Sequence, residues 1–247
     1  VEARVRFTSD LDSALLGVGF VQECTPERLD VKQQLLRQAA IQTAAEVPLA
    51  SSSSAIVASR LAEGLDTAIA ARILVGHPGN PPVRLTVIEV VPSPSTAGSI
   101  TERTVEVYRT AGLRPVLVRR EVEGFVFNRL QGALLREAYC LVRDGVASVD
   151  DIDEVVRSGL GRRWSVIGPF ETADLNTRGG IESHADKMGP AYQRMGAERG
   201  QSDPWTPELV AEVTAQRRAL LDLDDWDERV RWRDRQLLRL REASPTV

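Results

Sequence analysis

The chain changes pattern near residue 122, and this change constrains its fold more than any other feature. Before it, short β-branched runs alternate with helical stretches, which is typical of βα units on a largely parallel sheet. After it, apolar residues recur at helical spacing almost to the end of the chain. The sequence therefore predicts an α/β fold in two domains, a mostly parallel sheet with helices over residues 1–121 and an all-α C-terminal domain over residues 122–247.

The expected elements follow from these patterns. A helix begins at Pro26, because proline suits the first turn of a helix, and another covers residues 99–112. The predicted strands cover residues 4–8, 18–23, 47–51, 72–77, 86–91 and 115–119. In the second domain, helices are expected from residue 125, from Ser148 to the glycines at 159 and 161, and over residues 182–198, 207–221 and 225–242, with a loop over residues 162–180.

Composition excludes several function classes. The net charge of −4 argues against a nucleic acid as the partner, because phosphate binding needs a basic face. No stretch approaches the ~20 apolar residues that a membrane helix needs, and the first residues lack the pattern of a signal peptide. A cytoplasmic protein that does not contact membranes is therefore expected. The two cysteines, Cys24 and Cys140, lack metal-ligand spacing, so we expect no metal site.

The residues that most directly suggest chemistry are His77 and Glu89. His77 opens the segment HPGNPP at the carboxyl end of a predicted strand, the edge where ligands bind in open α/β sheets. Glu89 lies in a later, otherwise apolar strand, where an unpaired carboxylate is costly to bury. Since a carboxylate beside a histidine stabilises its charged form, the pair is a candidate general base. The alternative is a structural histidine in a proline-rich turn and a glutamate on an edge strand.

Two polar features are candidates to complete this site. Four serines at residues 51–54 follow a predicted strand, which puts hydroxyl groups near the same sheet edge. A loop with a helix cap is the simpler interpretation of such a run. Asn128 lies near the start of the first helix of the second domain, where it is a candidate to face a cleft between the domains. Taken alone, it is an ordinary polar residue of an amphipathic helix.

The chain contains no complete dinucleotide-binding fingerprint. Gly17 and Gly19 form a G-x-G pair, but the third glycine of G-x-G-x-x-G is missing and the next residues are predicted as a strand. The fingerprint instead needs a strand-to-helix turn whose N–H groups meet the pyrophosphate. The chain also opens with Val1 and a segment that resembles a middle strand, so we expect the true start of the protein to lie upstream.

Taken together, the motifs resemble the 3-hydroxyacyl-CoA dehydrogenase family, most closely its lambda-crystallin or L-gulonate 3-dehydrogenase branch. The resemblance extends from about residue 5 into the last predicted helix, and the form HPGNPP favours this branch over the fatty-acid enzymes. The motifs that carry it are, in order, VQECTPE at residues 21–27 with Lys32, the serines at 51–54, HPGNPP at 77–82, Glu89, GFVFNRLQ at 124–131 and GPFE at 168–171.

The resemblance implies an NAD-dependent oxidoreductase with a Rossmann-type first domain. It implies that His77 is the general base that removes the proton from a substrate 3-hydroxyl, and that Glu89 orients it. It also implies that Ser54, with Ser53 as the other choice, hydrogen-bonds the reacting oxygen and that Asn128 contacts the substrate. The residues for which it implies contacts with the cofactor are Glu27, Lys32 and Asn80.

The resemblance is incomplete at the N-terminus. The family's first βα unit, with its glycine-rich turn and its acidic residue for the ribose, has no counterpart here, and a βαβ unit takes ~30 or more residues. The sequence therefore predicts an incomplete Rossmann-type sheet. We expect the full-length protein to be the enzyme, and this chain by itself to bind NAD poorly or not at all.

The resemblance outlines the substrate and the assembly. It implies a small 3-hydroxy substrate, either an acyl-CoA or a sugar acid. Arg162, Arg163 and Arg178 are candidates to neutralise a carboxylate, although ordinary surface arginines explain them as well. Apolar residues of the late helices, such as Trp226 and Trp232, predict a homodimer through the C-terminal helices. The competing hypothesis is a crystallin-like, non-catalytic structural or binding protein with the same fold.

Overall fold

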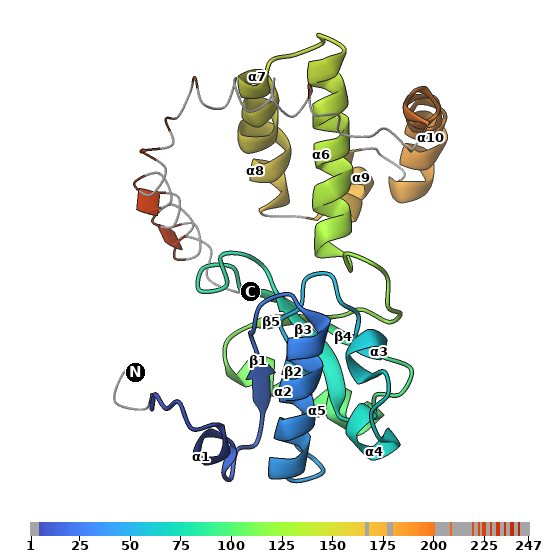
Figure 1. Cartoon of the computed structure of the whole chain (residues 1–247). Coiled ribbons are helices and arrows are strands. Elements are labelled where there is room, and N and C mark those ends of the chain that lie inside the picture. Colours follow the sequence, from blue (N-terminus) through green and yellow to red (C-terminus); the bar gives the residue numbers. More distant parts are fainter. Residues whose placement is uncertain are drawn as a thin grey trace. The chain divides into compact units, whose positions relative to one another are not determined.

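The computed structural model describes residues 5–165, 168–176 and 180–200, together with some single positions after residue 200. Of the continuously described residues, those up to Gln131 belong to one compact unit and those from Gly132 onward to a second (Figure 1). The helices expected over residues 207–221 and 225–242 lie outside the continuously described residues. Among the helices that the structure describes, none combines the length and the apolar character needed to traverse a bilayer.

The first unit is built on a five-stranded sheet in the order β1-β2-β3-β4-β5. Neighbouring strands are parallel except β3 and β4, which are antiparallel. Parallel neighbours need crossover connections, and the helices between β1, β2 and β3 supply them. The predicted mostly parallel α/β sheet is thus confirmed. The strands are β1 (Val21–Glu23), β2 (Leu49–Ser51), β3 (Ile73–Pro78), β4 (Val87–Pro92) and β5 (Arg114–Leu117).

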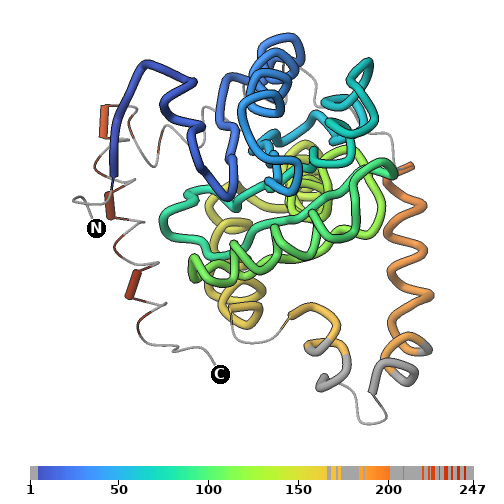
Figure 2. Tube along the Cα trace, turned by 90° about the horizontal axis from the view of Figure 1, so that it is seen from below, coloured from blue at the N-terminus to red at the C-terminus, as the bar shows by residue number. Residues whose placement is uncertain are grey.

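Helices cover both faces of this sheet, with α2 and α5 on opposite sides (Figure 2). Successive strand residues point to opposite faces. Leu49 and Ile73 therefore pack with α2, α3 and α4 on one face. Ala50 and Leu74, their neighbours in the chain, pack with α5 on the other. The helices are α1 (Leu11–Leu15), α2 (Leu29–Gln42), α3 (Ala58–Ala62), α4 (Thr67–Ala70) and α5 (Gly98–Thr110).

The strand expected at residues 4–8 is wrong for the residues that the structure describes. Residues 5–8 are irregular, and residue 4 lies outside the described part of the chain. A strand needs a neighbour to pair its backbone N–H and C=O groups. In the described sheet β1 pairs only with β2, so residues 5–8 do not extend the ladder beyond β1.

The second unit is helical. α6 (Phe127–Arg143) carries the predicted apolar stripe, and its Leu134 and Leu135 are 37% and 38% exposed. Tyr139 and Val142 of α6 pack with Val149 and Ile152 in a small cluster. The helix expected over residues 182–198 is confirmed as part of α10 (Gly180–Arg199).

For residues 148–180, the predicted start of the first helix is confirmed, but its predicted end and the loop expected after it are wrong. Ser148 and Asp151 form a capping box that starts α7 (Val149–Glu154), as the sequence suggested. The helix does not stop at the glycines, because Gly161 keeps a helical φ of −66°. It continues through a π-helical stretch, η2 (Val155–Leu160), into α8 (Gly161–Trp164), and α9 (Pro169–Asn176) then begins at a proline where a loop was expected.

Candidate active site

His77 and Glu89 form a buried, hydrogen-bonded pair. The antiparallel register of β3 and β4 places the two residues opposite each other, and His77 Nδ1 lies 2.9 Å from Glu89 Oε2. His77 is 6% exposed and Glu89 3%. The structure therefore brings together the two side chains proposed as base and orienting carboxylate, and Nε2 is the imidazole nitrogen that Glu89 does not engage.

The Glu89 carboxylate also holds the start of α6. Its Oε1 atom accepts hydrogen bonds from the backbone N–H groups of Val126, at 2.7 Å, and Phe127, at 3.0 Å. Burial opposes the charge of Glu89, but the hydrogen bonds from His77 and from these two N–H groups outweigh it and lower the pKa of the carboxyl. Glu89 is therefore charged at neutral pH and suited to stabilise a protonated imidazole.

A strained turn aims these backbone groups at Glu89. Phe125 has a φ of 48°, in the left-handed region that residues with a Cβ seldom occupy, and it follows Gly124 with a φ of 74°. The Phe125 ring is fully buried, and its centroid lies 5.5 Å from that of the His77 ring. The turn thus packs an apolar ring against the imidazole and presents two N–H donors to its carboxylate partner.

The serine run forms the loop after β2. Ser53 is fully buried, and its hydroxyl donates to Glu27 and accepts from the N–H of Ile56. Ser54 is exposed, and its carbonyl oxygen accepts a hydrogen bond from Asn128 Nδ2 at 3.3 Å. Since the Ser53 hydroxyl is engaged within the protein, Ser54 is the better placed of the two serines to offer a hydroxyl to a ligand.

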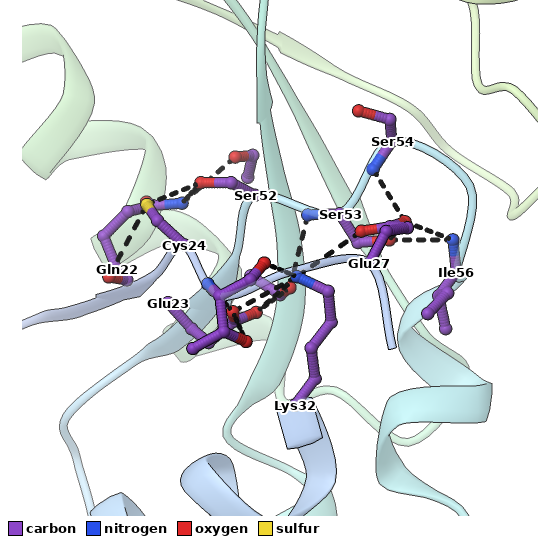
Figure 3. A network of polar contacts seen from close by, with 12 residues as sticks. Gln22, Glu23, Cys24, Glu27, Lys32, Ser52, Ser53, Ser54 and Ile56 are labelled. Atoms are coloured by element: carbon purple, nitrogen blue, oxygen red, sulfur yellow. Dashed lines mark hydrogen bonds and ion pairs between the residues drawn. The ribbon is translucent and has the colours of Figure 1, made fainter. Parts of the chain in front are cut away.

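Glu27, in the segment that follows β1, holds this loop, and Lys32 of α2 contacts Glu27 (Figure 3). Glu27 Oε1 accepts the N–H groups of Ser54, Ala55 and Ile56 at 3.2, 3.0 and 3.3 Å. The Lys32 side chain is 1% exposed, with Nζ 3.4 Å from Glu27 Oε2, whereas the Glu27 side chain is 42% exposed. Glu27 is therefore accessible to a ligand, while Lys32 is enclosed in this conformation.

The other predicted residues lie outside this set of contacts. Asn80 is exposed in the loop that follows β3. Arg162 and Arg163 are exposed in α8 of the second unit, and Arg178 lies outside the described residues. Within the described part of the chain, no three His, Cys, Asp or Glu side chains are grouped so that they could hold a metal ion. Contacts join the predicted residues in two groups: His77 with Glu89, and Ser54 with Asn128 and with Glu27, which also contacts Lys32.

Sequence reasoning gave no role to Gln22, Glu23 or Tyr108. The Gln22 side chain donates to Ser52 Oγ at 2.8 Å and accepts from the Tyr108 hydroxyl. Glu23, the last residue of β1, is 2% exposed and bound to Lys32. Gln22 and Glu23 are the two polar residues that end the short apolar run GFVQE. This position at the end of a strand was the sequence signal that could have singled them out.

Comparison with known proteins identifies the family. Residues 1–122 match the model of the 3-hydroxyacyl-CoA dehydrogenase NAD binding domain, and residues 124–220 match that of the 3-hydroxyacyl-CoA dehydrogenase C-terminal domain. The chain belongs to the 3-hydroxyacyl-CoA dehydrogenase family.

Similar proteins carry several names within this 3-hydroxyacyl-CoA dehydrogenase family. A lambda-crystallin homolog from Bos taurus is 43% identical over 187 residues, which are 76% of this chain and 57% of that protein. A 3-hydroxyacyl-CoA dehydrogenase from Gibberella moniliformis is 36% identical over 242 residues, 95% of this chain and 74% of the relative. The chain thus spans little more than half of the first relative and about three quarters of the second.

A solved structure of similar fold covers most of the chain. It is that of 5-formyl-3-hydroxy-2-methylpyridine 4-carboxylic acid 5-dehydrogenase, an NAD+-dependent dismutase. The two chains share 28% sequence identity and superpose with a TM-score of 0.80 over 96% of this chain and 77% of the other. The likeness supports the Rossmann-type sheet followed by helices.

The arrangement of the first unit is compatible with binding NAD, the cofactor named in the matched family domain. β1, β2 and β3 are parallel, so their carboxyl ends meet at one edge of the sheet, where ligands of such sheets bind. The loops that leave this edge carry the half-exposed Glu27 and the exposed Ser54. Polar groups that can meet a cofactor therefore lie beside the His77–Glu89 strands.

Proposed function

We propose that the full-length protein oxidises the 3-hydroxyl group of a 3-hydroxyacyl-CoA or 3-hydroxy acid to the 3-oxo product, with NAD as the hydride acceptor. The observation that carries this proposal is the buried imidazole–carboxylate pair of His77 and Glu89, with 2.9 Å between Nδ1 and Oε2. A histidine whose other ring nitrogen is held by a carboxylate is suited to act as a general base.

His77 acts as the general base in this reaction. Because Nδ1 is hydrogen-bonded to Glu89, Nε2 takes the proton of the substrate hydroxyl. The carboxylate of Glu89 stabilises the positive charge that the imidazole gains. NAD, when bound, accepts the hydride from the carbon that bears the hydroxyl, and that carbon is left as a carbonyl.

The remaining site residues bind and orient the substrate and the cofactor. The Ser54 hydroxyl donates to the reacting oxygen, and the Asn128 amide, which contacts the Ser54 carbonyl, contacts the substrate. Glu27 and Asn80 line the cofactor side, since both are accessible. Lys32 is enclosed and contributes through Glu27.

We also propose how the chain is organised. Residues 1–121 form the NAD-binding domain and residues 122–247 a helical domain for substrate binding and dimerisation; the change of family model between residues 122 and 124 supports this division. The protein acts in the cytoplasm as a homodimer on a small molecule. Its net charge of −4 favours a small-molecule substrate over a nucleic acid.

A substrate panel tests the reaction. The full-length protein is supplied with NAD and, separately, with 3-hydroxybutyryl-CoA, L-gulonate and L-carnitine, the last because some relatives are named L-carnitine dehydrogenase. We expect NADH to form with at least one of the three, and the product to be the 3-oxo compound by mass. NADH formation with none of them would contradict the proposal.

The similarity to lambda-crystallin homologs supports a second candidate function. In this alternative the protein keeps the fold as a non-catalytic structural or binding protein. It predicts no NADH formation with any hydroxy acid, even when NAD binds. The same panel therefore separates the two candidates.

A further inference from the structure

The loop after β2 is linked to a buried ion pair, Glu23–Lys32, whose carboxylate has no role in the proposed reaction. Lys32, at the start of α2, directs its ammonium at Glu23, the last residue of β1 (Figure 3). Nζ donates to both carboxylate oxygens of Glu23 at 3.1 Å and to the carbonyl of Thr25 at 3.0 Å. The two side chains are 1% and 0% exposed. Their charges are therefore compensated by each other and by neighbouring groups rather than by water.

Glu23 also fixes the base of the serine loop. Besides Lys32, its carboxylate accepts hydrogen bonds from the N–H and hydroxyl of Thr25 and from the hydroxyl of Ser51. Ser51 in turn accepts the N–H of Ser53 at 3.2 Å. These hydrogen bonds lower the pKa of Glu23, although burial opposes its charge. One carboxylate thus ties β1, β2 and α2 together where the loop begins.

Lys32 carries the link onward to Glu27. Its Nζ lies 3.4 Å from Glu27 Oε2, and Glu27 Oε1 accepts three consecutive backbone N–H groups, those of residues 54–56. Successive N–H groups that converge on one anion fix the loop's conformation. The loop in that conformation offers the Ser54 carbonyl to Asn128. The contacts therefore run without interruption from Glu23 to the residues proposed to bind the substrate.

A buried ion pair of this kind adds little stability compared with apolar residues of the same volume, because both charges lose their water. Breaking it by removing one charge, however, leaves the other uncompensated. We infer that Glu23 is a positioning residue, which acts through Lys32 and Ser51 to hold Glu27 and residues 51–56 where Ser54 can meet the substrate. The catalytic consequence rests on the proposed function, whereas the ordering of the loop does not.

Amide hydrogen exchange tests the positioning directly. In the full-length protein, Glu23→Gln removes the charge but keeps the shape, and Glu23→Asp keeps the charge. We expect the amides of Ser54, Ala55 and Ile56 to exchange roughly ten- to a hundredfold faster in Glu23→Gln, the range for hydrogen bonds to charged groups. The Asp variant should recover part of the protection. Glu63→Gln, which breaks an exposed pair with Arg60, is the control and should change nothing.

Kinetics of the same variants show whether the loop matters for turnover. At a temperature where each is fully folded, Glu23→Gln should lower kcat about tenfold or more while the pH profile of kcat keeps its midpoint, because the His77–Glu89 pair is untouched. Glu23→Asp should restore part of kcat. If Glu23→Gln does not fold, Ser51→Ala, which keeps the ion pair, should give the same change in exchange on a smaller scale.

The outcomes separate the two claims. Faster loop exchange in a protein with no turnover in any variant would leave the positioning intact and overturn the proposed function. Unchanged exchange of residues 54–56 in Glu23→Gln, or in Ser51→Ala if the first variant does not fold, would overturn the positioning of the loop by Glu23. Faster exchange with an unchanged kcat in an active enzyme would show that the loop is ordered by Glu23 but that its order does not serve catalysis, which also overturns the inference.

Discussion

Three hydrogen bonds converge on the Glu89 carboxylate, one from the His77 imidazole and two from the backbone at the start of α6. The residue is 3% exposed, so water cannot replace these donors. Bonds to a charged acceptor are stronger than those to a neutral one. The charge of this single carboxyl therefore supports the base and the first turn of α6 together.

The stability of the protein should depend on that charge in a defined pH range. The folded-state pKa of Glu89 lies below the ordinary value of 4.5, so its contribution is present above that value and is lost as the pH falls through the folded pKa. We expect Glu89→Gln to lower the free energy of unfolding at pH 7 by about 1–3 kcal/mol. Urea unfolding across the acidic range should show the difference shrinking as the wild-type carboxyl is protonated. A difference that is constant down to the lowest pH would contradict this account.

Only the His77–Glu89 pair of the candidate site could be predicted from residue types, whereas the roles of the other site residues were implied by the family resemblance. Glu89 stood out because a carboxylate in an apolar strand needs a partner, and His77 because it lies at the carboxyl end of a strand. β3 and β4 pair the two residues in register. The enclosure of Lys32 could not be predicted, since it depends on how β1, β2 and α2 pack around Glu23. The choice of Ser54 over Ser53 likewise depends on a contact with Glu27 that sequence spacing does not reveal.

Strand β3 and helix α5 pack so closely that no side chain has room at Gly76. A Cβ added there would overlap the hydroxyl of Tyr108. Tyr108 is 4% exposed and donates its hydroxyl hydrogen to Gln22, so it cannot turn aside without losing that bond. The contact fixes how closely α5 approaches the sheet.

We expect Gly76→Ala to destabilise the protein by about 1–3 kcal/mol, the usual range for an overpacked core. Gly98→Ala is the matched control, since an added Cβ there meets nothing within 4 Å, and it should change stability by no more than about 0.5 kcal/mol. Thermal or urea unfolding of both variants measures the difference. Equal stabilities would show that α5 shifts freely against β3.

The sequence predicted best the strands whose runs of apolar residues are buried on both faces of the sheet. Strand β2 falls within its predicted run, and β3 and β4 each end one residue beyond theirs. The match is close because both faces of the sheet are buried. Residues 162–180 were misjudged because their glycines and Pro169 suggested a loop. Proline at a helix start and glycines with helical φ are compatible with α8 and α9, and spacing alone does not show which will occur.

In a single copy of the chain, the second unit exposes several large apolar side chains to water. Phe170 of α9 is 83% exposed, and Tyr192 and Met195 of α10 are 55% and 53% exposed. Exposed apolar groups of this kind mark contact surfaces when they adjoin one another. The proposed homodimer through the helical domain would cover side chains of this kind.

Light scattering tests this assembly. We expect the full-length protein to have the mass of a dimer, and Phe170→Glu to shift it toward the monomer, because a charge at an apolar interface must be desolvated. Phe7→Glu is the control, since Phe7 is 91% exposed in the first unit. A wild-type monomer would discard the proposed dimer. A dimer that Phe170→Glu leaves intact would place the interface elsewhere.

The proposed reaction depends on one of the two histidines in the chain. The measurement that tests it most directly is the rate of NADH formation by the full-length protein after His77→Ala and, separately, after His184→Ala in α10. A positioned general base contributes roughly a hundred- to ten-thousandfold to rate, so His77→Ala should lower kcat by that range and His184→Ala should leave it unchanged. A folded His77→Ala enzyme with wild-type turnover would contradict the account.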